Sequence, residues 1–286
     1  MIELRNVTHW RVGRTIDVFD IVSSAEVGVM HCHPTINIGA VVEGNASIEW
    51  NGGTYAQPQG SVILLNAFEA HASAWHSRKN HYFVMNIGQP TWAHLCAMLT
   101  QGDDRLRLRG PICHDQIIYH SLLGIRAELI SGSQNVSLDD IAGLLETMSR
   151  RNVLVEDDAP SAETMEEFRL RIGQVLDCGD GGGPKIEQIA QDLGLSRFQL
   201  SKLVRQAAGM QPRRLRLQLM VATAQFNISS GLSLSYAAAN SGFSDQSHMN
   251  REFRRTLGMT PREYQQVRAR LPEKPRSDEE VSNLQE

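Results

Sequence analysis

Two sets of polar side chains in the last third of the chain have the chemistry needed to contact DNA bases. Arginine pairs with guanine through two hydrogen bonds, asparagine and glutamine pair with adenine, and an apolar side chain contacts the thymine methyl group. Both sets are predicted to face outward from short helices, and they comprise Arg197, Phe198, Ser201, Lys202 and Arg205, then Gln246, Ser247, Asn250, Arg251 and Arg254. These side chains predict a double-stranded DNA partner that is read in the major groove.

Three histidines in the first third offer a second kind of chemistry. His31, His33 and His71 resemble the metal-ligand histidines of cupins in their spacing, and this resemblance implies that they could bind zinc or iron, since imidazole is a common ligand of both metals. They could equally hydrogen-bond a polar effector or be structural. His76 and His81 are expected at the surface. The sequence has no phosphate loop, no nucleophile elbow and no H-E-x-x-H motif, so no catalytic residues are predicted.

The DNA-reading residues belong to a duplicated unit. One copy runs from Gly194 to Arg213 and the other from Gly242 to Arg262, and both end in Gly-Met-x-Pro-Arg. Each copy follows a short helix with one apolar face, turns at its glycine, and begins a second helix capped by Ser196 or Ser244. This is the pattern of a helix-turn-helix. Two matched copies are much stronger evidence for DNA binding than one.

A single helix from Pro212 to about Ile228 is predicted between the two copies. At 1.5 Å per residue it is roughly 25 Å long. It could hold the two recognition helices about one DNA turn, roughly 34 Å, apart on one face of the duplex. One chain would then span two successive major grooves.

The first ninety residues are predicted to form β structure that carries the histidines. Short apolar runs at 36–42, 46–50, 62–65 and 82–87 are separated by turn residues, and Asn51-Gly52 is typical of a type I′ hairpin. Close spacing of many strands favours a small barrel or sandwich. Trp50 and Tyr55, beside this hairpin, are expected to help wall a pocket.

Two amphipathic helices are predicted after the strands, at 116–130 and 137–149, the second begun by a capping box of Ser137 with Asp140. They either brace the barrel or pair between chains in a homodimer. The polar stretch 151–163 is predicted to be a linker, and the acidic tail 273–286 to be disordered. The expected domains are therefore 1–150 and 164–272, in an α+β chain.

Composition is consistent with a DNA-binding protein of the cytoplasm. The chain has 286 residues and a net charge of −4, but residues 164–272 carry 15 Lys+Arg and 9 Asp+Glu, so their net charge is +6. A basic segment on an acidic chain indicates a polyanion partner for that segment. No apolar run is long enough to span a membrane, and no secretion signal is present. The four cysteines form no C-x-x-C pair and are expected to be free thiols.

The segment from about Thr164 to Leu271 resembles the DNA-binding domain of the AraC/XylS transcription regulators. The resemblance is most specific at Gly242–Phe253 and at Gly258–Tyr264. It implies base contacts from Phe198, Ser201 and Lys202 and from Gln246, Ser247, Asn250 and Arg251. The chain departs from the family in the linking helix, where Met220 replaces a usual arginine and Arg216 a usual aliphatic residue.

The first domain resembles the cupin-like sensor domain of the same family. His31, His33, Gly44, Gly60 and His71 follow cupin spacing, while Asn37 stands where a metal-binding cupin has glutamate. Sensor domains of this family usually bind small organic effectors without a metal. The resemblance therefore implies that His31, His33, Asn37 and His71 bind an effector, with no metal or other cofactor. It also implies an activator that contacts promoter DNA and RNA polymerase; the competing class is a metal-dependent cupin enzyme fused to a DNA-binding domain.

Overall fold

The computed structural model describes residues 4–13, 16–24, 26–100, 106–132, 136–156, 190–191, 194–208, 210–229 and 231–269. Within these residues, twelve strands and three helices make up the first part of the chain, and five named helices make up the second. The expected tail at 273–286 and most of the expected linker lie outside the described residues. None of the described helices is both long and apolar enough to cross a membrane.

A six-stranded antiparallel sheet is the largest element of the first domain. Its strand order is β1-β2-β9-β4-β7-β11. Its strands are β1 (Leu4–Val12), β2 (Ile16–Ser23), β4 (Ile36–Glu43), β7 (Val62–Leu65), β9 (Asn80–Ile87) and β11 (Ile112–Cys113). Three of these, β4, β7 and β9, correspond to predicted apolar runs or extend them, whereas the β1–β2 hairpin and β11 were not predicted.

A four-stranded sheet of order β3-β8-β5-β6 lies against the first. It contains β3 (Glu26–Val27), β5 (Asn45–Trp50), β6 (Gly53–Pro58) and β8 (His71–Trp75). Asn51 and Gly52 both have positive φ, at 48° and 76°, which confirms the predicted hairpin between β5 and β6. Val41, Ile48, Ile63 and Leu65 form a small apolar cluster from both sheets. The cupin-like β architecture expected from the sequence is confirmed.

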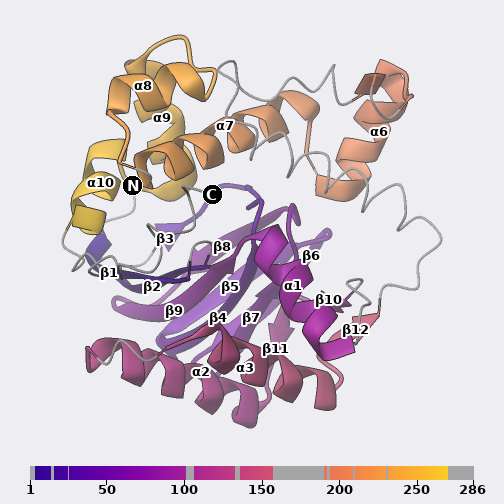
Figure 1. The fold of residues 1–286 in the computed structure, drawn as a ribbon, viewed down its shortest axis with the longest axis vertical. Coiled ribbons are helices and arrows are strands. Elements are labelled where there is room, and N and C mark those ends of the chain that lie inside the picture. The colour runs from indigo at the N-terminus through magenta and orange to yellow at the C-terminus, as the bar shows by residue number, and fades with distance from the viewer. Residues whose placement is uncertain are drawn as a thin grey trace, which may run out of the picture.

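Three helices cover the outside of the barrel (Figure 1). They are α1 (Gln89–Thr100), α2 (Gln116–Ile130) and α3 (Leu138–Arg150). Leu122 and Ile125 of α2 pack in the same core cluster as Ile38 and Met85 of the large sheet. The capping box of Ser137 with Asp140 is present as predicted. The inward face of α2 therefore braces the barrel.

The first domain extends beyond residue 150. Strand β12 (Leu154–Glu156) pairs with β10 (Leu106–Leu108) in a small antiparallel sheet. The polar stretch predicted as a linker therefore starts no earlier than residue 157. Cys32, Cys96 and Cys113 are free thiols in the described residues, and Cys178 lies outside them.

The second domain is entirely helical in the described residues. Its helices are α6 (Arg197–Ala208), α7 (Pro212–Ser229), α8 (Leu234–Asn240), α9 (Gln246–Leu257) and α10 (Pro261–Ala269). Helix α7 is the predicted linking helix and packs against the other four. Met220, where the related family usually has arginine, is 1% exposed in an apolar cluster, which explains why an apolar residue suits this position.

The two domains pack on one another, with the helical domain covering one end of the barrel (Figure 1). Phe19 of β2 and Val84 of β9 lie in the same apolar cluster as Val221 of α7 and Tyr264 of α10. Tyr264 is 3% exposed, and its ring centroid lies 6.5 Å from that of His9 on β1. The contact between domains is therefore an apolar core.

Candidate functional site

In the described part of the first helix-turn-helix unit, the turn and the start of the second helix have the local geometry that the sequence predicts, while most of the first helix lies outside the described residues. Gly194 makes the turn with φ of 64°. Ser196 caps α6 by accepting from the Gln199 amide at 3.3 Å, while the Gln199 side chain accepts from the Ser196 amide at 2.9 Å. This reciprocal pair is a capping box, and it fixes where the recognition helix begins.

Helix α6 buries one face and exposes the predicted one. Leu200 and Val204 are buried in the core. The exposed residues of the predicted set are Arg197, Phe198, Lys202 and Arg205, while Ser201 is half-buried. Phe198 is 80% exposed, which is unusual for a phenylalanine and leaves its ring available for an apolar contact.

The second unit repeats this arrangement with one difference at its cap. The turn is at Gly242, with φ of 83°. The N-cap of α9 is Asp245, whose carboxylate accepts from the His248 amide at 2.7 Å, and not Ser244 as the sequence predicted. The Ser244 hydroxyl donates to Asp245 at 3.0 Å. The prediction missed by one residue because both types cap helices well.

Helix α9 presents all five predicted side chains to solvent. Met249 and Phe253 are buried, and the exposed residues are Gln246, Ser247, Asn250, Arg251 and Arg254. Arg254 and Arg255 stand in the last turn, where the helix dipole favours positive charge. Glu252 instead pairs with Arg214 of α7 at 3.4 Å, which ties the recognition helix to the linking helix.

A cavity of about 390 Å³ lies between the barrel and the helical domain. Its barrel side includes Phe19, Ile21 and Val84, and also the three histidines. Its other wall comes from the second domain, through residues that include Phe226, Met259 and Tyr264. The cavity is thus polar at the histidines and apolar where the two domains meet, which suits an amphipathic small molecule.

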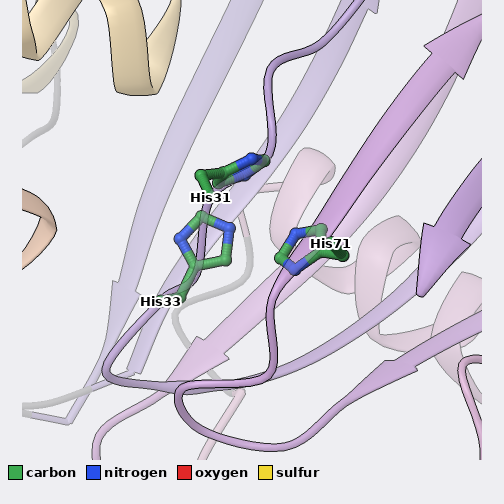
Figure 2. Close-up of side chains that lie close together, drawn as sticks. All are labelled: His31, His33 and His71. Atoms are coloured by element: carbon green, nitrogen blue, oxygen red, sulfur yellow. The ribbon is translucent and has the colours of Figure 1, made fainter. Parts of the chain in front are cut away.

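The three histidines, which all line this cavity, lie close together (Figure 2). His31 forms an isolated β-bridge with His71, so residues forty positions apart lie opposite one another. The ring centroids are 4.4 Å apart for His31 and His71, 4.8 Å for His31 and His33, and 5.2 Å for His33 and His71. The sequence therefore correctly grouped these three side chains.

All three imidazoles are neutral near pH 7. Burial, together with a smaller effect of the neighbouring His31, lowers the pKa of His33 to about 3. Burial is also the main cause that lowers the pKa of His31 and of His71. Arg214 lowers the pKa of His31 further, and His31 and His33 lower that of His71, while a backbone hydrogen bond to each ring opposes the shift. Neutral rings can donate and accept hydrogen bonds or coordinate a metal.

Asn37 lies beside the histidines on β4 and also lines the cavity. Its amide donates to the Asn86 side chain at 2.8 Å. Trp50 and Tyr55, which were expected to wall the pocket, do not line it. The Trp50 indole instead donates to Glu69 at 3.3 Å, and Tyr55 is 39% exposed.

One of the two histidines expected at the surface is half-buried. His81 lies 2.8 Å from Asp20, whose carboxylate is also bound by Arg126 of α2. His76 bonds Ser47 at 3.0 Å and is exposed, as predicted. The contact of His81 could not be predicted because its partners, Asp20 and Arg126, are 61 and 45 residues away.

Comparison with known proteins supports the reading of both halves. Residues 189–267 match the model of a helix-turn-helix domain, and residues 26–147 match that of the AraC-like ligand binding domain. The chain belongs to the AraC family of transcription regulators. This AraC-family chain combines a DNA-binding domain with a ligand-binding domain, as an effector-responsive transcription regulator does.

Solved structures share the two-domain fold of this AraC-family regulator. ToxT from Vibrio cholerae O395 aligns with a TM-score of 0.64 at 14% identity, covering 91% of this chain and 100% of that one. ToxT from Vibrio cholerae strain SCE256, solved with an unsaturated fatty acid bound, aligns with a TM-score of 0.66 at 16% identity, covering 93% and 100%. Comparison with curated proteins gives no match.

The second-domain wall of the cavity was missed by sequence reasoning. Ala222, Gln225, Phe226 and Ser229 of α7 all line it, and they recur at the spacing of one helix face. Phe226 is 57% exposed on that face, a property that the sequence alone does not give.

Proposed function

We propose that this regulator reads promoter DNA with the outward residues of α6 and α9. The observation that carries this proposal is that both recognition helices pack on α7 and turn their predicted polar faces to solvent. Arg251 is proposed to bond a guanine and Asn250 an adenine, while Phe198 contacts a thymine methyl group. The remaining exposed arginines and Lys202 serve bases or phosphates.

The test compares specific with non-specific binding. The operator is first recovered by selecting genomic fragments on the purified chain, and affinities are then measured for it and for random DNA in one buffer. Arg251→Ala should weaken operator binding by about 1–3 kcal/mol and leave random-sequence binding less affected. Arg150→Ala, an exposed arginine on α3 of the first domain, is the control and should change neither. An unchanged ratio for Arg251→Ala would remove that residue from base recognition.

The effector is proposed to occupy the cavity between the domains, with a polar or anionic group at His31, His33, Asn37 and His71. Its apolar part would contact Phe226 and Met259 of the second domain. Support comes from the amphipathic lining, and from ToxT having been solved with an unsaturated fatty acid and with (E)-4-(8-methylnaphthalen-1-yl)but-3-enoic acid, both carboxylic acids with apolar bodies. The polar metabolite expected from the sequence is thereby extended to a molecule with an apolar part.

Thermal melting with a series of monocarboxylates from acetate to oleate tests this assignment. A ligand that binds only the folded chain stabilises it by about 2.7 kcal/mol at one hundred times its Kd. Phe226→Ser should reduce the shift caused by the longer acids. Tyr236→Ser, which changes an equally exposed aromatic residue of α8 away from the cavity, should not. Equal shifts in both variants would place the ligand elsewhere.

We further propose that the regulator acts as a homodimer in the cytoplasm, activates transcription and contacts RNA polymerase. The dimer would use the outward face of α2, where Ile117 and Ile130 are 54% and 51% exposed. The cytoplasmic location follows from the DNA partner. Activation and the polymerase contact rest on the family to which the chain belongs.

A further inference from the structure

In two of the clustered histidines, hydrogen bonds to the backbone place the lone pair on the same ring atom, Nε2. The Nδ1 atom of His31 lies 2.8 Å from the Val29 carbonyl oxygen, and that of His71 lies 3.0 Å from the Glu69 carbonyl oxygen. A carbonyl can only accept, so Nδ1 carries the proton in both rings and Nε2 carries the lone pair. A backbone carbonyl on the far nitrogen is the usual orientation of a metal-binding histidine.

The third ring completes a compact donor set. One ligand atom from each of His31, His33 and His71 lies within 4.8 Å of the others. Zinc–nitrogen bonds of about 2.1 Å in a tetrahedron place the nitrogens roughly 3.4 Å apart, so the rings need to close by about an ångström. Ring rotation supplies such a movement, because two of the side chains are only half-buried.

The neighbouring side chains add no further ligand, so the donor set consists of three neutral imidazole nitrogens. Cys32 is buried and packs in the hydrophobic core, not in the histidine cluster. The Glu69 carboxylate accepts from Trp50 and from Asn66. Asn37, at the position of the glutamate in metal-binding cupins, is a neutral amide.

We propose that His31, His33 and His71 hold a divalent transition-metal ion, such as zinc, whose remaining coordination position faces the cavity between the domains. Three histidines with an open fourth position form the donor set of zinc sites that bind a further ligand. All three side chains line the cavity, so a molecule inside it reaches the ion directly.

The ion also explains how this cavity attracts an anion. Among the described residues that line the cavity, the cationic side chain is Arg11. Its Nε and Nη2 atoms donate to the Asp17 carboxylate at 2.8–3.0 Å. A zinc ion held by three neutral ligands keeps its full double charge. It therefore favours a carboxylate or similar oxygen donor as the fourth ligand. This part of the inference rests on the proposed effector cavity.

Cobalt binding to the full-length chain tests the metal site. Tag-free protein is stripped with a chelator and titrated with Co²⁺, which reports its coordination by visible absorption. We expect one ion per chain, with the absorption of a nitrogen-bound tetrahedral or five-coordinate site, displaced by one equivalent of Zn²⁺. Removing a partner that merely orients a ligand costs 10–100-fold in metal affinity, so His33→Ala should lose more than about 100-fold.

The control is His94→Ala, which removes an exposed histidine of α1 and should bind Co²⁺ like the unmodified chain. Thermal melting of the stripped proteins verifies that His33→Ala is folded. His33→Cys supplies a second variant, which should still bind Co²⁺ but with a sulfur-to-cobalt absorption band. Binding that survives His33→Ala, or no binding by the unmodified chain, overturns the site.

Acetate and azide, added to the cobalt-loaded chain, test the open position. Entry of either anion should change the visible spectrum, and longer carboxylates should compete with azide. A spectrum that neither anion changes would mean a closed, structural metal site. It would overturn the inference that an anion is the fourth ligand. Operator binding by the stripped protein is measured separately, so failure of the metal site is distinguishable from failure of the proposed regulator function.

Discussion

Arg126 on α2 fastens this helix to the barrel, and its replacement by methionine should cost about 2 kcal/mol of unfolding free energy. Its guanidinium donates to both oxygens of Asp20, at 2.8 and 2.9 Å. The two side chains are 22% and 13% exposed, so solvent screens this pair only in part. Fully exposed pairs contribute about 0.2–1 kcal/mol, whereas removing one partner of a buried pair costs about 3–5 kcal/mol.

Methionine keeps the apolar stem of Arg126, so the variant removes charge and hydrogen bonds with little loss of packing. A loss of 2 kcal/mol lowers the melting temperature by about 4–8 °C for a domain of this size. Arg150→Met is the matched control on the next helix. Its ion pair with Glu146 is exposed at both ends and should contribute no more than about 0.5 kcal/mol. Equal melting temperatures for the two variants would refute the reasoning.

The same contact predicts a dependence on pH. Burial would raise the pKa of Asp20, but hydrogen bonds from His81 and Arg126 outweigh it and hold the pKa below its usual value. The stabilisation is therefore fully present above the unfolded-state pKa of about 3.9 and is lost as pH falls through the lower folded-state value. Arg126→Met should reduce the loss of stability between about pH 4 and lower values, as measured by urea unfolding. An identical acid profile would contradict this.

Three further variants test the packing of the helices. Leu122→Ala should cost about 2–5 kcal/mol in urea unfolding, because Leu122 is fully buried against the barrel; a loss below about 1 kcal/mol would mean that this contact is absent. Gly258→Ala should destabilise the second helix-turn-helix by about 1 kcal/mol in thermal melting, because Gly258 has φ of 74°; an unchanged melt would contradict that conformation. Ile117→Ser with Ile130→Ser should give monomers by light scattering without lowering the melting temperature, and a persisting dimer would exclude this face.

Local features of the fold were predictable because neighbouring residues determine them. The capping boxes at Ser137 and Ser196 need only residues three positions apart, and the Asn51-Gly52 turn needs two. The inward and outward faces of α6 and α9 follow from the 3.6-residue helical period. The same regularity explains why the exposed recognition residues could be named without a structure.

Features that depend on distant segments were not predictable in the same way. Strand β4 is buried on both faces, since Ile38 meets the outer helices while Val41 meets the second sheet. Its continuous apolar run therefore indicates a strand but not which side faces the cavity. The prediction that Trp50 and Tyr55 wall the pocket was wrong for a similar reason. A position beside a hairpin does not show which other elements pack against it.

The cavity itself could not be read from either domain's sequence alone. Phe226 and Tyr264 reach it only because α7 and α10 dock on β1 and β2, more than 200 residues earlier in the chain. The proximity of the three histidines, in contrast, was predicted from the resemblance to cupins. That resemblance implies that His31 and His71 lie together although they are distant in the sequence.

Helix α7 lines the cavity and packs against both recognition helices, so a tilt of α7 at the cavity would also move these helices. Its 18 residues make a rod roughly 27 Å long at 1.5 Å per residue. Phe226 lines the cavity near the C-terminal end of α7, while α6 immediately precedes its N-terminal end. A tilt of only about 5° over that length moves the far end by about 2 Å, which is comparable with the reach of a hydrogen bond. In the proposed DNA complex, the spacing of the two half-sites that one chain spans would therefore depend on what fills a cavity far from either groove.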